Sequence, residues 1–271
     1  MKAGRTTNSG FPYLFYILAF GWTWAFWGPV ALAENGYLAL SPLVAAFLMD
    51  GSPAAWGPLI AAVIVAIKRE GRAGLRGLLA SMIRVRFKTR WYLVALLLLP
   101  AIVGGAQLIA WGLGEDVPMS EAFANPISIP FAFVWIFFLG GPLQEEAGWR
   151  GTATGPIQQR LGAVGASMVT GVFWGLWHLP LFYMPRADIY YNQPIWGLMI
   201  STVLLSVLLT WVYQNTGKSL FAVMLMHTTW NWSNYLFTTL QTDLGGLAFF
   251  GLMAGTIGFV VLRYGAKDLR R

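Results

Sequence analysis

Side chains that could carry out chemistry gather first in the segment Gln144-Glu145-Glu146-Ala147-Gly148-Trp149-Arg150. On a helix, Glu146 and Arg150 are four residues apart and share a face, where an ion pair forms readily. Glu145 points about 100° away, so it is left without that cation. A buried carboxylate without a cationic partner suits general base catalysis. The alternative is a charged patch that only snorkels to the end of a helix.

The only two histidines of the chain, His178 and His227, stand in two further segments. His178 follows Trp174 by four residues and comes just before Pro180, which loosens a helix and leaves room for a water or a carbonyl. His227 and Asn231 are four residues apart, so together they could donate two hydrogen bonds to one oxygen, as an oxyanion hole does. A polar stripe that only joins two helices would use the same residue types.

The composition says what kind of chain must position these groups. Hydrophobic residues make up 57% and charged residues 11%, where about 25% charged residues is usual for a soluble domain. An aromatic content of 15% excludes a disordered chain. The absence of cysteine excludes disulfides, cysteine-ligated zinc, iron–sulfur clusters and a cysteine nucleophile. The sequence predicts an all-α polytopic membrane protein with a single membrane domain over 1–271, in which ionisable residues within the spans are functional candidates.

Eight apolar stretches are near the length that crosses a hydrocarbon core of about 30 Å, so we expect about eight transmembrane helices. The first stretch is too long for the apolar region of a signal peptide, which it otherwise resembles. The second is short and could be extended by Leu38–Met49, with a break at Asp50-Gly51-Ser52-Pro53. The predicted spans are Phe11–Ala33, Pro53–Ile67, Trp91–Leu113, Ile127–Gln144, Val164–Met184, Ile195–Tyr213, Leu220–Phe237 and Gly245–Leu262.

The net charge of +7 suggests nucleic-acid binding only until its distribution is considered. With the N-terminus in the cytoplasm and alternating spans, all of the 18 Lys and Arg residues except Arg186 fall in inside segments, which is the asymmetry that sets membrane topology. The basic residues of 68–90 are then topology determinants that also rest on lipid headgroups. We expect an integral protein of a prokaryotic cell membrane, with both termini cytoplasmic, the lipid bilayer as a partner and no nucleic acid.

Depth within the membrane raises a difficulty for one shared site. Both histidine-bearing spans start inside, and His227 then lies about 7 residues, or roughly 10 Å, from its span's start. His178 lies about 14 residues, or roughly 21 Å, from Val164. For the two to meet, the helix of His178 must start later, near Ser167, or tilt, and we expect residues 152–163 to form a separate surface segment.

The three segments in this order resemble the CAAX protease and bacteriocin-processing family of intramembrane endopeptidases. The resemblance covers about 130–235, the expected catalytic core, by motif, and the remainder by helix pattern only. One position departs from the family pattern: phenylalanine is usual four residues before the second-motif histidine, and here the residue is Trp174, with Phe173 beside it. The residues that carry the resemblance are Glu145, Glu146, Arg150, His178, His227 and Asn231.

The resemblance implies an endopeptidase that hydrolyses a peptide bond of a membrane-associated or lipidated peptide or protein, reached from the cytoplasmic side. It implies that Glu145 and His178 activate a water and that His227 and Asn231 bind the oxyanion. Glu146 and Arg150 would brace the site beside Trp174.

Two questions stay open at the level of the sequence. Glu145, His178 and His227 could instead bind one Zn²⁺, because two histidines and a glutamate are a known catalytic zinc set. The pairing of His227 with Asn231 favours a metal-free site that needs no cofactor. The other function classes are a non-catalytic membrane scaffold or bacteriocin-immunity-type protein and, with less support because no two matching halves are found, a transporter.

Overall fold

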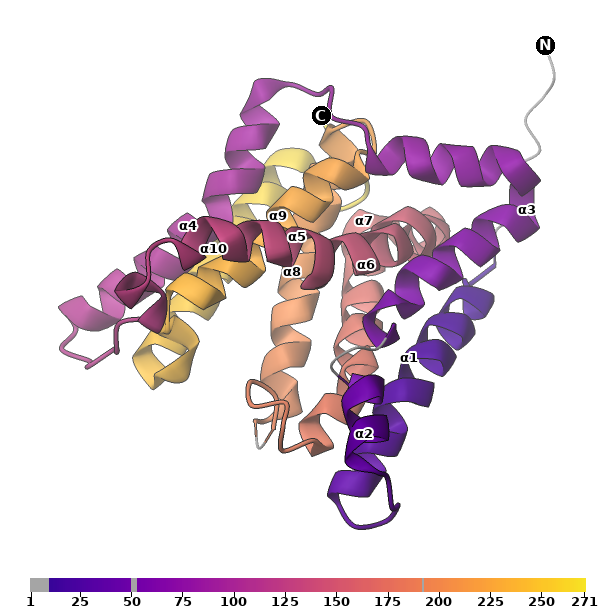
Figure 1. Cartoon of the computed structure of the whole chain (residues 1–271). Helices are drawn as coiled ribbons and strands as arrows, with labels where there is room; N and C mark the ends of the chain where they lie inside the picture. The colour runs from indigo at the N-terminus through magenta and orange to yellow at the C-terminus, as the bar shows by residue number, and fades with distance from the viewer. Residues whose placement is uncertain (1–9, 50–52, 192) are drawn as a thin grey trace.

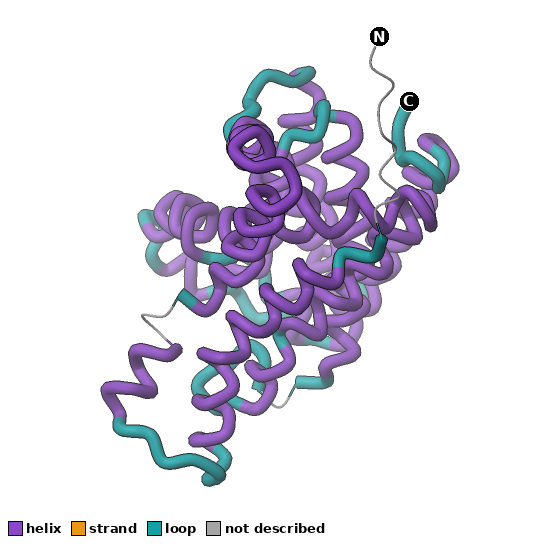
Figure 2. The backbone as a smooth tube through the Cα atoms, turned by 90° about the vertical axis from the view of Figure 1, so that its right-hand side faces the viewer, coloured by secondary structure: helices purple, strands orange, loops and turns teal. Residues whose placement is uncertain are grey.

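The computed structural model describes residues 10–49, 53–191 and 193–271, and every regular element in these ranges is a helix (Figures 1 and 2). Lys2, Arg5 and residues 50–52 of the break predicted at 50–53 lie outside the described residues. The helices are α1 (Tyr13–Glu34), α2 (Pro42–Met49), α3 (Gly57–Met82), α4 (Thr89–Gly112), α5 (Ser128–Leu139), α6 (Pro142–Gly148), α7 (Thr154–Trp177), α8 (Ile195–Asn215), α9 (Leu220–Leu236) and α10 (Asp243–Tyr264). A π-helical turn, Trp149–Ala153, joins α6 to α7.

The all-helical membrane class is confirmed. Among the described residues, α1, α4, α8 and α10 are long and apolar enough to cross a membrane. These four helices coincide with four of the predicted spans. The other predicted spans correspond to shorter, broken or more polar helices: α9 has 17 residues and α5 has 12. Helix length and composition therefore support membrane insertion, while the number of eight crossings stays a prediction.

Two predicted spans differ from the helices that form. The span 127–144 was predicted as one segment, but α5 ends at Leu139 and α6 begins at Pro142. Gly141 between them has φ +115°, a conformation that favours glycine. The span 164–184 is also too long, because α7 ends at Trp177 and a 3₁₀ turn follows. The loosening predicted beyond His178 is thereby confirmed.

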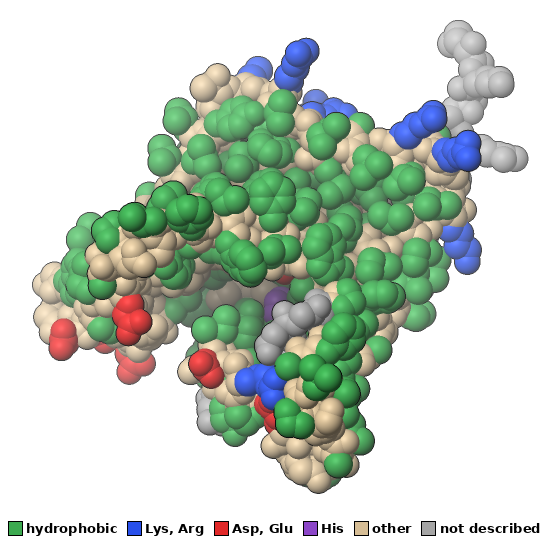
Figure 3. Space-filling view, in the orientation of Figure 1, with side chains coloured by type: hydrophobic (Ala, Val, Ile, Leu, Met, Phe, Trp, Pro, Cys, Tyr) green, Lys and Arg blue, Asp and Glu red, His purple; other side chains and the backbone are tan. Residues whose placement is uncertain are grey.

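The connections between helices gather at two ends of the molecule. At one end, Ser219 Oγ donates to the Arg84 carbonyl at 2.6 Å, and the Ala163 amide donates to the Lys267 carbonyl at 2.6 Å. At the other end, Ser120 Oγ donates to the Tyr235 carbonyl at 2.7 Å. Lys and Arg side chains lie mainly along the upper edge and Asp and Glu side chains along the lower edge of the molecule (Figure 3). The tertiary structure thus keeps together the connections that the charge pattern assigns to one side.

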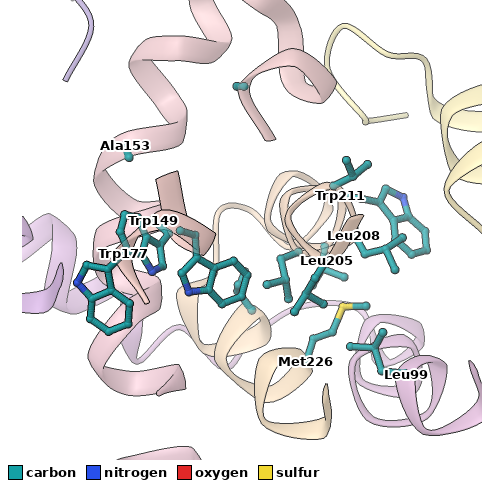
Figure 4. Close-up of a cluster of buried hydrophobic side chains, with 14 of the residues drawn as sticks. Leu99, Trp149, Ala153, Trp177, Leu205, Leu208, Trp211 and Met226 are labelled. Atoms are coloured by element: carbon teal, nitrogen blue, oxygen red, sulfur yellow. The ribbon is translucent and has the colours of Figure 1, made fainter. Parts of the chain in front are cut away.

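The core that supports the site lies where α7, α8, α9 and α4 meet. Helices α7 and α8 touch through their backbones: a Cβ on Gly171 would lie 2.5 Å from the Val203 Cα. Small residues permit this close approach between membrane helices. Leu205 of α8 lies between a pair of tryptophans on one side and the side chains of α9 and α4 on the other (Figure 4). The tryptophans are Trp149 and Trp177, whose ring centroids are 6.0 Å apart.

Candidate active site

Helix α6 presents two adjacent carboxylates to two different surroundings. The sequence Gly140-Gly141-Pro142 ends α5 and starts α6, and the Gln144 side chain accepts the Gly141 amide at 3.1 Å. This cap fixes the first turn of α6, and Glu145 and Glu146 come directly after Gln144. Both are buried, at 5% and 0% exposure.

Glu145 has no cationic partner among the described residues, but it is not free. Its Oε2 accepts the indole N–H of Trp174 at 2.5 Å and that of Trp149 at 3.2 Å. These two hydrogen bonds fix the orientation of the carboxylate. The prediction of a carboxylate without an ion-pair partner is confirmed, and the two indole donors are partners that the sequence did not predict. Because both indoles use Oε2, Oε1 is the oxygen available to a water.

Glu146 sits between two partners. Its Oε1 accepts from Arg150 Nη1 at 3.0 Å, which confirms the predicted ion pair, and from His227 Nδ1 at 2.7 Å. Arg150 also donates to Ser206 Oγ at 2.9 Å and lies 4.5 Å above the ring of Trp174. Since a carboxylate only accepts, the hydrogen in the Glu146 contact is on His227 Nδ1. The bracing role assigned to Glu146 thus extends to holding a histidine.

His178 is oriented in a comparable way at the end of α7. Its Nδ1 lies 2.9 Å from the Trp174 carbonyl, which only accepts, so Nδ1 carries the hydrogen and Nε2 keeps its lone pair. The imidazole is also flanked by aromatic rings: Trp177 meets it edge-on at 4.7 Å, and Tyr190 stacks on it at 5.6 Å. These contacts leave Nε2 as the nitrogen that can accept a proton.

One cavity of about 100 Å³ brings the predicted residues together. Asn231 is held there by its Nδ2, which donates to the Gly140 carbonyl at 2.8 Å. A hollow with a histidine side chain at its bottom is visible on one face of the molecule (Figure 3). The lining residues are Gly140, Glu145, Trp174, His178, Tyr190, Leu198, Ser201, Thr202, Leu205, His227, Trp230 and Asn231. Of the supporting residues, Glu146 and Arg150 are buried behind this wall.

Tilt explains how His178 and His227 reach the same cavity. Helix α7 is kinked at Gly162, and its second part, which ends just before His178, starts directly after this glycine. This part of the helix therefore does not start later than predicted. Instead, α9 runs obliquely to α7 and α8 (Figure 1). Residues 154–161 do form a separate helical piece, since Gly162 has φ +71°. The expectation of a surface segment there is wrong in part, because Ile157 is 3% exposed.

Several residues of the site were missed in the sequence. The Gly-Gly-Pro run before Glu145 is a turn signal that could have located the start of α6. Trp149 and Ser206 gave no comparable signal, since an indole or a hydroxyl on an apolar helix does not reveal its partner. Tyr190 belongs to the connection between α7 and α8 and lies outside the three segments.

The donor set does not match a three-ligand zinc site. Zn²⁺ would require three side chains to converge at about 2.0–2.2 Å on one ion. In the part of the chain that the structure describes, no group of three or more His, Asp or Glu side chains is arranged to hold one. We therefore derive no step through a metal.

Comparison with known proteins shows which family this chain is similar to. The model of the family described as type II CAAX prenyl endopeptidase Rce1-like matches residues 126–233, which include all the residues discussed on α6, α7 and α9. CAAX prenyl protease 2 of Methanococcus maripaludis is 25% identical to this chain over 239 residues, covering 85% of the chain and 86% of the relative. This chain is similar to the CAAX protease family, and the predicted resemblance is confirmed. The similarity supports a protease of the endopeptidase type.

The similarity to CAAX prenyl proteases agrees with the four helices that are long and apolar enough to cross a membrane. The departure at Trp174 now has a structural consequence. A phenylalanine at this position could not donate the hydrogen bond that Glu145 accepts from the indole. This chain thus holds Glu145 with an indole N–H, a donor that phenylalanine lacks.

Proposed function

We propose that this protein is an intramembrane endopeptidase that hydrolyses a peptide bond of a membrane-associated, prenylated peptide or protein. The observation that carries the proposal is the convergence of Glu145, His178, His227 and Asn231 on one small cavity. The relative is called a prenyl protease, which supports a lipid-bearing substrate. A cavity walled by apolar helices suits a substrate that is itself held in the bilayer.

In the proposed mechanism, a water lies between Glu145 Oε1 and His178 Nε2. Both atoms can accept a proton, because the indoles occupy the other carboxylate oxygen and the Trp174 carbonyl holds the His178 Nδ1 hydrogen. The water oxygen attacks the peptide carbonyl carbon as its proton moves to this pair. The carbon–nitrogen bond then breaks, and the same proton goes to the leaving amine.

His227 and Asn231 bind the oxyanion in this mechanism. Glu146 accepts the Nδ1 hydrogen of His227, so Nε2 donates to the oxyanion in the form of the imidazole that carries a hydrogen on both nitrogens. Preorganised donors of this kind stabilise the transition state because they need no reorientation.

The test is hydrolysis of a prenylated, internally quenched peptide by the purified full-length protein in lipid nanodiscs. We expect cleavage by the wild type and none above background by Glu145→Gln. A membrane phenotype that survives Glu145→Ala at normal expression would instead support the scaffold or immunity-type function.

The same assay tests the metal question. We propose a metal-free site, for which chelators have little effect on the rate. Stoichiometric zinc that is lost together with activity, and that restores activity when added back, would overturn this part of the proposal.

We further propose eight membrane crossings in a prokaryotic cell membrane, with both termini cytoplasmic. The grouping of the basic connections at one end of the molecule supports this topology. A reporter fused at residue 118 should lie outside, and reporters at 78 and 271 inside. A cytoplasmic reporter at 118 would contradict the eight-span topology.

The side from which the substrate arrives belongs to the same proposal. The sequence predicts access from the cytoplasm, but Tyr190 of the cavity wall stands in a connection that this topology places outside. Lateral access between the helices reconciles the two, since a lipid-anchored substrate diffuses within the bilayer. The chain contains no cysteine, so Asp188→Cys can be labelled selectively. An impermeant thiol reagent that blocks cleavage only when it is added outside would contradict cytoplasmic access.

A further inference from the structure

A second and larger cavity adjoins the catalytic one. Its volume is about 460 Å³, against about 100 Å³ for the catalytic cavity. Leu139 and Gln144 in its wall flank Gly140 and Glu145 of the first cavity along the chain. Tyr190 lines both cavities, so its side chain forms part of the boundary between them.

The ring of Tyr190 is held in this place by aromatic contacts and by its own connection. It stacks on His178 with an interplanar angle of 28° and meets Phe182 edge-on at 5.6 Å. Its amide donates to the Ala187 carbonyl at 2.8 Å. Arg186 of the same connection pairs with Glu34 at the end of α1. The boundary is thus a fixed side chain, tied to α1 as well as to the site.

The second cavity offers a mainly apolar wall. Burial, followed by the negative charge of Glu145, raises the pKa of Tyr190 above its ordinary value, so the phenol stays uncharged beside this wall. A peptide whose scissile carbonyl faces Glu145 and His178 would pass this ring to reach the second cavity. The wall consists of Trp27, Ala55, Leu139, Leu181, Ala187 and Ile189, together with Gln144, Arg186, Asp188 and Tyr190.

We propose that the second cavity binds a large apolar side chain of the substrate next to the scissile bond, and that Tyr190 determines which side chains pass. This inference rests on the proposed endopeptidase function. Tyr190 is a specificity-determining residue here: its ring limits the width between the two cavities, and its hydroxyl is not required. Removing the ring should join the cavities and admit bulkier residues at that position.

The experiment compares two prenylated, internally quenched peptides that differ only in Ala or Trp next to the scissile bond, which mass spectrometry of the products identifies. We expect Tyr190→Ala to raise the Trp-to-Ala ratio of kcat/KM by about tenfold, the scale of a pocket contact worth 1–3 kcal/mol. Tyr190→Phe should keep the wild-type ratio, because it keeps the ring. Tyr191→Ala is the matched control, since Tyr191 is the next residue of the same connection and lines neither cavity.

A binding measurement separates this inference from the proposed function. The same two peptides are titrated against Glu145→Gln and against Glu145→Gln combined with Tyr190→Ala, so that no turnover is needed. A shift in the ratio of the two dissociation constants supports the role of Tyr190 even if the wild type cleaves neither peptide. An unchanged ratio in both assays, or an equal shift with Tyr191→Ala, would overturn the inference.

Discussion

The two sides of α6 solve the problem of a buried carboxylate in opposite ways. On one side, Glu146 is enclosed with Arg150 and His227, and the side chains of the ion pair have no exposed surface. On the other side, Glu145 faces a cavity and takes its hydrogen bonds from the neutral indoles of Trp149 and Trp174. A cation neutralises the first carboxylate, whereas neutral donors leave the charge of the second in place. Adjacent residues of the same type can therefore serve structure and chemistry separately.

This difference has a physical basis in the helix. Successive residues are rotated by about 100°, so neighbours cannot share one partner. The side facing α9 supplies a histidine and a buried cation, and the side facing the end of α7 supplies indole donors and open space. Four predictions would break or sharpen the comparison, beginning with the largest effect.

Glu145→Gln should leave yield normal and lower the rate of peptide hydrolysis by at least about 10²-fold, the scale of a missing general base. The amide keeps the shape of the side chain but cannot accept the proton of the water. Steady-state kinetics on the prenylated peptide measure the loss. Glu121→Gln, at an exposed position, is the control and should behave like the wild type. Full activity of Glu145→Gln would show that Glu145 is not the general base.

Glu146→Leu should lower stability by about 3–5 kcal/mol, because it leaves the Arg150 guanidinium buried without its partner. Chemical denaturation in detergent, together with membrane yield, measures this effect. Combining it with Arg150→Met should restore much of the stability, since replacing a buried pair with apolar residues is often neutral. The double variant should still lack activity, because His227 Nδ1 has lost its acceptor. An active double variant would show that Glu146 serves only the fold.

Gly141→Ala should reduce kcat by about tenfold and cost about 1–3 kcal/mol of stability. The backbone has φ +115°, and a Cβ would lie 2.5 Å from Glu145 Oε1, so the carboxylate must move. The assay is the same hydrolysis, with a thermal melt in detergent. Gly155→Ala, where a Cβ would meet no atom within 4 Å, should change little. Equal behaviour of the two variants would mean that the close approach at Glu145 is not needed.

Glu115 sharpens the comparison as a carboxylate outside the spans. Desolvation acts to raise its pKa, but hydrogen bonds from Thr242 and from the amides of Leu244 and Gly245 hold the pKa below its usual value of 4.5. The contribution to stability is then present above the unfolded pKa and is lost as the pH falls through the folded pKa. The difference in melting temperature between the wild type and Glu115→Gln should be small at pH 7 and vanish as the pH falls through the folded pKa, which lies below 4.5. A difference that grows in acid would contradict this sign.

Local spacing explains which contacts could be predicted. The pair of Glu146 with Arg150 follows from a separation of four residues on a helix, and the loosened helix beyond His178 follows from Pro180. The Gly140-Gly141-Pro142 run is a turn signal from which the break at Gly141 could have been predicted. The apolar length of 127–144 predicted one continuous span instead. The bond between His227 and Glu146 joins positions 81 residues apart, and no spacing rule reaches that far.

The sequence by itself determined the class of protein, the helical character of its spans and the set of side chains available for catalysis. The composition indicates that the chain folds in a lipid bilayer. Ionisable groups within a membrane raise the free energy of the fold, so those that are present are functional candidates. Only the tertiary structure decided what surrounds each of these groups. The indoles on Glu145, the Glu146 contact of His227 and the ring of Tyr190 depend on the tilt and close packing of helices that are distant in the chain.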